Sequence, residues 1–289
     1  MGRFFRISEF ALSFILVAFA TSLPEFFLGL SSAIKGVSVL SLGNLIGANV
    51  LDLSLVIGVA LIAAGDINFK NIFNGDDAKI AIGATLLPAL FILDGVLGRG
   101  EGIILLFLFA GYVVYLLSQK ERVSPKLDNI ARPHNIHAAL GGFTKHLVRF
   151  ILGAIILLLA SSIVVSKSIE FSHLVSIPVF FVGVLTALGT TLPELVFSIK
   201  SVFMKHSSMS LGNAFGSVIV NILLVLGVVS VINPVIIPDV SAPLFGIAAT
   251  VFVIITISAT GFIWGKLSRI FGLFLLLLSA VFLVVQSAF

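Results

Sequence analysis

Long apolar runs, separated by short polar stretches, make up most of the chain from one end to the other. Nine of these runs approach the ~20 residues that a helix needs to cross the hydrocarbon core of a bilayer. We therefore predict an all-α polytopic membrane protein. Its nine expected transmembrane helices cover about Phe10–Ile34, Ser41–Ala64, Ala78–Leu93, Gly102–Leu117, Val148–Val165, Leu174–Phe203, Met209–Ile232, Ala242–Ala259 and Ser268–Ser287.

One extended polar stretch, residues 118–147, interrupts this pattern and separates four spans from five. We interpret residues 1–117 as the first half of the protein, 118–147 as a linker and 148–289 as the second half. The linker carries three histidines, His134, His137 and His146. A solvated loop is favoured over a metal or pH-sensing site, because no acidic partner or helical spacing accompanies them.

Charged side chains make up only 10% of the 289 residues, against roughly a quarter in soluble domains. When successive spans are assumed to cross the membrane in opposite directions, fourteen of the 17 lysines and arginines fall on one side of it. The positive-inside rule then predicts a cytoplasmic N-terminus and linker and an outside C-terminus, and we expect the cell membrane. Because topology accounts for the net charge of +4, we expect no nucleic-acid partner. The absence of cysteine excludes thiolate metal sites and cysteine nucleophiles.

Residues 18–58 and 187–227 repeat each other without a gap, at a constant offset of 169. Fifteen of the 41 aligned positions are identical, and they include proline, glutamate, asparagine and glycine, which apolar composition alone does not explain. An odd number of predicted spans separates the starts of the two copies, so the copies enter the membrane from opposite sides. This is the inverted repeat typical of secondary transporters, whose substrate site lies near the midplane between interrupted helices.

Two glutamates inside predicted spans, Glu25 and Glu194, each follow a proline that should break or kink the helix. An intramembrane carboxylate costs at least ~2.5 kcal/mol, and no lysine or arginine lies in a span core to pair with it. We therefore predict that the glutamates bind a cation or a proton. Asp52 and Asn221 occupy matching positions, 27 residues after their respective glutamates.

The other polar groups near these positions are oxygen donors: Asn44, Asn213, Ser217 and the backbone carbonyls that the two prolines release. Oxygen ligands suit calcium and, in smaller numbers, sodium. Asn44 and Asn213 could bind the ion or could hydrogen-bond the neighbouring broken helix, and both readings stay open. The glycines Gly43 and Gly47 fit better as a small-residue packing face.

These motifs resemble those of a known family. TSLPE at 21–25 and TTLPE at 190–194, each followed by LGNxxG, resemble the paired alpha repeats of the calcium/cation antiporter superfamily, most closely the sodium/calcium exchanger branch. The resemblance implies alternating access, with calcium or sodium held centrally by Glu25, Asp52, Glu194 and Asn221. It also implies flanking sodium sites built from hydroxyls and from two alanine carbonyls, at Thr21, Ser22, Thr190, Thr191, Ser217, Ala18 and Ala187.

The chain departs from the family pattern at three points. The family pattern that this chain resembles has ten spans, and the first of them has no counterpart in this sequence. We therefore expect either a missing N-terminal helix or a partner that supplies it. Ala20 stands where the motif usually has glycine. Ala48 stands where the second copy has Ser217, which removes one hydroxyl from a sodium site.

We expect a secondary active antiporter that exchanges calcium for sodium across the membrane, without enzymatic activity or a cofactor. Its expected partners are membrane lipid and the two transported ions. The alternatives are calcium/proton or other cation/proton antiport and, from a different class, a non-transporting or channel-like membrane subunit.

Overall fold

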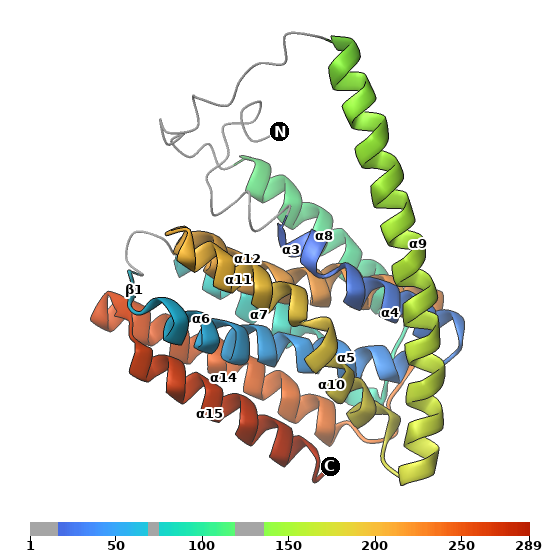
Figure 1. The fold of residues 1–289 in the computed structure, drawn as a ribbon. Helices are drawn as coiled ribbons and strands as arrows, with labels where there is room; N and C mark the ends of the chain where they lie inside the picture. Colours follow the sequence, from blue (N-terminus) through green and yellow to red (C-terminus); the bar gives the residue numbers. More distant parts are fainter. Residues whose placement is uncertain (1–16, 69–74, 119–135) are drawn as a thin grey trace.

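The computed structural model describes residues 17–68, 75–118 and 136–289, which form an inverted-repeat helical bundle (Figure 1). The first half contains α3 (Ala18–Thr21), α4 (Leu23–Ile34), α5 (Ser38–Leu51), the π-helix η2 (Asp52–Val56), α6 (Ile57–Ala64), α7 (Gly75–Phe91), the short 3₁₀ turn η3 (Ile92–Asp94) and α8 (Arg99–Ser118). The second half contains α9 (Ile136–Val175), α10 (Val179–Thr190), α11 (Leu192–Phe203), α12 (Ser207–Ile219), the π-helix η5 (Val220–Val225), α13 (Leu226–Ile232), α14 (Ser241–Trp264) and α15 (Arg269–Gln286).

Within the described residues, seven helical stretches are long and apolar enough to cross a membrane. These are the stretches α5–α6, α10–α11 and α12–α13, each taken as one span, together with α8, α9, α14 and α15. With the shorter α4 and the 17-residue α7, they follow the order of the nine predicted spans. The predicted start at Phe10, the N-terminus and the linker residues 119–135, with His134, lie outside the described residues.

The fifth predicted span was placed too narrowly. The 40-residue helix α9 extends beyond Val148–Val165 at both ends, so the predicted boundary between linker and second half falls inside it. His137 and His146 therefore lie on a helix. The next span does not begin at Leu174, because α9 continues to Val175 and Pro178 caps the start of α10. The span was predicted from its apolar run alone, and the helix continues beyond that run into more polar sequence at both ends.

Two short antiparallel strand pairs join the halves at opposite ends of the bundle. The strand β1 (Ile67–Asn68) pairs with β4 (Lys266–Leu267), and β2 (Val96–Leu97) pairs with β3 (Val235–Ile236). Lys266 also forms a 2.6 Å ion pair with Asp66 beside the first of these pairs. Each half contributes one strand to each pair, so the pseudo-symmetry extends beyond the repeated motifs.

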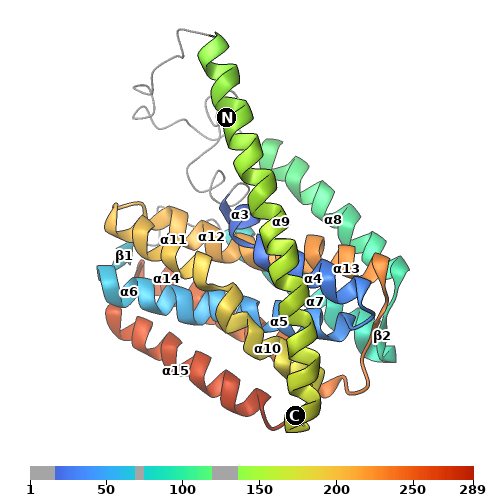
Figure 2. The same cartoon turned by 45° about the vertical axis from the view of Figure 1, so that its right-hand side comes forward.

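The central helices are α5–α6 and α12–α13, which carry the second part of each repeat. In an apolar 18-residue stretch of each of these two spans, 83% and 78% of the residues are buried, against 17% in such a stretch of α9. Both views show α9 running obliquely along one side of the bundle, where it contacts α4 and α10 (Figures 1 and 2). Ser31 and Ser161 share a 2.8 Å hydrogen bond in this contact, and Lys35 donates to Ser166 Oγ at 2.6 Å. The repeats thus form the core, and α9 is peripheral.

Candidate cation-binding site

The first span of each repeat is broken at the position that the sequence predicts. α3 ends at Thr21 and α4 begins at Leu23, and in the second half α10 ends at Thr190 and α11 begins at Leu192. A proline lies in the first turn of each following helix, where its missing N–H costs nothing. The glutamates occupy the same first turns, so the positive ends of the α4 and α11 dipoles favour their charged forms.

The second span of each repeat contains a π-helix at matching positions. η2 begins at Asp52, and η5 begins one residue before Asn221. A π-helical stretch inside an α-helix is rare and occurs frequently at functional sites. Its appearance in both copies places Asp52 and Asn221 at equivalent irregularities in the centre of the bundle.

The three acidic side chains of the site are buried without a positive partner. Glu25, Asp52 and Glu194 are each 1% exposed. None of them forms an ion pair within the described residues, and both oxygens of each glutamate and Oδ1 of Asp52 lack a hydrogen-bond partner. Glu25 and Glu194, from opposite halves, lie close enough for their charges to repel, and Asp52 is close to both. Buried polar atoms are almost always satisfied, so this cluster calls for a ligand.

The carboxylates alone do not complete a metal shell. In the described part of the chain no three histidine, aspartate or glutamate side chains are gathered closely enough to hold a metal ion by themselves. Neutral oxygens of the two repeats also have free capacity: Asn221 Oδ1, Ser22 Oγ and Ser217 Oγ are buried without partners within the described residues. A bound cation therefore has to take amide and hydroxyl oxygens as well as carboxylates, which is the mixed oxygen set that calcium and sodium accept.

Asn44 and Asn213 each bond a threonine at the broken helix of the other half. Asn44 Nδ2 donates to Thr190 Oγ1 at 3.1 Å and to Thr186 Oγ1 at 3.2 Å. In the mirrored contact, Thr21 Oγ1 donates to Asn213 Oδ1 at 3.1 Å. The structure thus shows the hydrogen bond to the broken helix of the other half, while Asn44 Oδ1 is buried without a partner, and ion binding by these asparagines stays a prediction. These asparagines tie the two broken helices across the pseudo-symmetry axis.

Sequence reasoning missed two polar residues of the site. Asn49 is buried in α5 and its Oδ1 accepts a 3.0 Å hydrogen bond from Asn221 Nδ2. Thr186, one turn before Thr190, accepts from Asn44. The repeat alignment hid Asn49 because its counterpart is Val218. A polar residue inside an otherwise apolar and glycine-rich span was the available signal.

The predicted backbone ligands are partly occupied. The carbonyl of Ala18 accepts the Ser22 amide at 2.9 Å, and the carbonyl of Ala187 accepts the Thr191 amide at 3.0 Å. A threonine hydroxyl also lies within hydrogen-bonding distance of each carbonyl, Thr21 Oγ1 at 3.3 Å from that of Ala18 and Thr190 Oγ1 at 3.5 Å from that of Ala187. An ion bound by these carbonyls would therefore have to displace a hydroxyl. Ala48 is fully buried and contributes no side-chain oxygen opposite the free hydroxyl of Ser217. The hydroxyl ligands of the two halves therefore differ.

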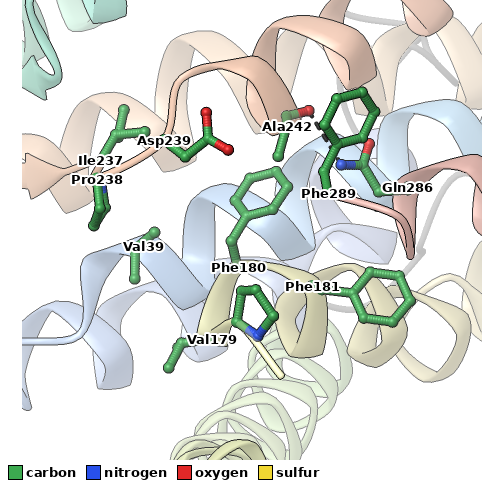
Figure 3. A pocket seen from close by; sticks show the side chains of 11 residues that line it. Val39, Val179, Phe180, Phe181, Ile237, Pro238, Asp239, Ala242, Gln286 and Phe289 are labelled. Carbon is green, nitrogen blue, oxygen red and sulfur yellow. Dashed lines mark hydrogen bonds between the residues drawn. The ribbon is translucent and has the colours of Figure 1, made fainter. Parts of the chain in front are cut away.

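Two cavities in the described part of the bundle differ in their relation to the broken helices. One, of about 490 Å³, lies among α4, α9 and α10 and is lined by Pro24, Ser161, Thr186 and Thr190, so it reaches the broken helices. The other, of about 340 Å³, is lined mainly by apolar side chains such as Phe180 and contains none of the predicted ligands (Figure 3). The first cavity thus borders the threonines that bond Asn44, although none of the three carboxylates lines it.

A family model described as sodium/calcium exchanger protein matches residues 1–118 and 145–288, which is most of the chain. The chain belongs to the sodium/calcium exchanger family. This exchanger homologue is therefore an integral membrane transporter of the cation antiporter class, and not an enzyme.

Individual relatives agree with the family assignment. The sodium/calcium exchanger MaX1 of Methanosarcina acetivorans is 27% identical over 96% of this chain and 89% of its own length. The inner membrane protein YrbG of Escherichia coli is 27% identical over 80% of this chain and 72% of its own. A solved structure of the sodium-calcium exchanger NCX_Mj, soaked with sodium and strontium, has a TM-score of 0.71 at 24% identity, and the match covers 97% of this chain and 88% of that one. The last comparison confirms the predicted transporter fold.

Proposed function

We propose that this exchanger homologue moves calcium across the cell membrane in exchange for sodium, by alternating access to one site between its two halves. The observation that carries the proposal is the cluster of buried, unneutralised carboxylates, Glu25, Asp52 and Glu194, drawn from both repeats. A cation is the partner that this cluster lacks. The name of the relative MaX1 supports sodium and calcium as the exchanged ions.

Within this proposal the central ion is held by the three carboxylates and by Asn221 Oδ1. Sodium ions take flanking positions formed by hydroxyls and backbone carbonyls at Thr21, Ser22, Thr190, Thr191, Ser217, Ala18 and Ala187. Calcium and sodium compete for the same carboxylates, so binding one ion favours release of the other. The N-terminus and central linker lie in the cytoplasm and the C-terminus outside, as the distribution of lysine and arginine supports.

Charge explains why the two fluxes are coupled. With all three carboxylates ionised the empty site is strongly negative, and burying uncompensated charge in a low-dielectric interior is expensive. Calcium, or several sodium ions, neutralises most of that charge. The loaded protein can therefore switch its ion site from one side of the membrane to the other, while the empty protein cannot. The site has to return loaded with the other ion, so transport is exchange and not uniport.

The test removes each charge with the smallest change of shape. Glu25→Gln and Glu194→Gln should each abolish calcium transport in proteoliposomes, because each leaves the cation without one of its buried anionic ligands. Glu170→Gln is the matched control, since Glu170 is exposed and forms a 2.6 Å ion pair with Lys167. Normal transport by either site variant, at normal expression and folding, is incompatible with the proposal.

A further inference from the structure

The two halves of the site differ in how their central side chains are supported. In the second half, Asn221 Nδ2 donates a 3.0 Å hydrogen bond to Asn49 Oδ1 of α5. In the first half the matching acid is Asp52, and the residue that the repeat places opposite it is Val218. α12, which carries Val218, contacts η2, which carries Asp52. The amide of Asn221 therefore has an asparagine as its neighbour, whereas the repeat places a valine opposite the carboxylate of Asp52.

Amide and carboxylate have different orientational needs. A carboxylate presents an acceptor oxygen whichever way it turns, whereas rotating an asparagine amide by half a turn replaces its oxygen with an NH₂ donor. A donor facing a cation is repulsive. Asn221 is fully buried, so only its protein neighbours decide which end faces the site. Its Nδ2 bonds Asn49, and its Oδ1 remains buried without a partner.

We propose that Asn49 is a positioning residue, which holds the amide of Asn221 with its oxygen available to the transported cation. This inference rests on the proposed function, because it takes Asn221 as a ligand. Asn49 itself makes no contact with the ion. Valine suffices at position 218 because Asp52 needs no such support.

Removing the acceptor should turn the amide. In Asn49→Val the Nδ2 group of Asn221 loses its partner, so the hydrogen bond that holds this end of the amide away from the cation is gone. The amide then directs N–H rather than oxygen toward the cation. Because the cation loses a ligand oxygen and faces a donor instead, calcium affinity should fall on the order of tenfold or more.

The experiment is a double-mutant cycle on calcium affinity, measured by equilibrium binding to the purified full chain in nanodiscs. The variants are Asn49→Val, Asn221→Asp and the double variant, which copies the carboxylate–valine pairing of the other half. Asn49→Val should weaken binding by about tenfold in the native background and by less than about twofold beside Asn221→Asp. Asn49→Asp, which keeps an acceptor at this position, should bind calcium no more weakly than the native chain and covers the case in which Asn49→Val does not fold.

The outcomes separate the inference from the proposed function. Equal calcium affinity for the native chain and Asn49→Val, or an equal loss in both backgrounds, overturns the positioning role and leaves the proposed function intact. A folded Asn49→Asp with calcium affinity reduced as far as expected for Asn49→Val also overturns it. A native chain that binds neither calcium nor sodium overturns the proposed function, and this inference with it.

Discussion

The crossing of α5 and α10 at Gly43 gives the most demanding prediction about packing. A Cβ atom added to Gly43 would lie 2.0 Å from the carbonyl oxygen of Phe180, and one added to Gly183 would lie 2.2 Å from that of Leu40. Real Cβ atoms essentially never approach another heavy atom closer than 3.0 Å. In Gly43→Ala the two backbones must therefore separate by about 1 Å, because neither contact is with a flexible side chain.

The same movement pulls the site apart. Asn44 follows Gly43, and its bonds of 3.1 and 3.2 Å to Thr190 and Thr186 cross the interface that must open. Lengthening them by about 1 Å takes both beyond hydrogen-bonding distance. Overpacking costs about 1–3 kcal/mol and each lost hydrogen bond about 1 kcal/mol more, so we expect a total loss of stability of about 3–5 kcal/mol.

The assay pairs thermal unfolding in detergent with calcium uptake into proteoliposomes. Gly43→Ala should lower the unfolding temperature and reduce uptake severely, although it removes no charge. Gly111→Ala on α8 is the control, because a Cβ there meets no atom within 4 Å. A Gly43→Ala protein with the stability and uptake of the native chain would refute the claim that this close crossing positions the broken helix.

Three further outcomes follow from the contacts described above. Asp52→Asn gives both halves an amide and removes one of three negative charges, so equilibrium binding should show much weaker calcium affinity with the fold retained by circular dichroism. The nearly isosteric Thr190→Val removes a partner of Asn44 and should lower calcium uptake, whereas Thr190→Ser keeps the hydroxyl and should retain most of it. Hydrogen bonding to Lys266 lowers the pKa of Asp66. The stabilisation from the Asp66–Lys266 pair is thus present above the ordinary aspartate pKa and is lost as the pH falls through the lowered pKa of Asp66. The unfolding temperatures of Asp66→Asn and of the native protein should therefore converge in acid.

Much of the architecture could be predicted from the sequence, because hydropathy and the internal repeat are both strong signals in a membrane protein. The order of the spans, the helix breaks beside Pro24 and Pro193, and the family resemblance all rest on such signals and are confirmed. The ion-binding roles of Glu25, Asp52, Glu194 and Asn221 remain predictions, supported by their burial.

Other features have no comparable signature in a linear sequence. The π-helices at Asp52 and Asn221 depend on packing around the bundle centre, not on local propensity. The bonds between the asparagines and threonines of opposite halves join residues about 150–200 positions apart, so only the folded arrangement reveals them. Asn49 was missed because the repeat alignment selects positions at which the two copies agree, and Asn49 aligns with Val218.

The central claim is that the buried carboxylates couple calcium movement to sodium. The most direct measurement loads proteoliposomes containing the native chain with sodium and follows calcium uptake after dilution into sodium-free medium at equal pH. Calcium uptake should need the outward sodium gradient, stop when that gradient is collapsed and disappear in Glu194→Gln. Uptake driven by a pH gradient alone, or a leak indifferent to both gradients, would contradict it.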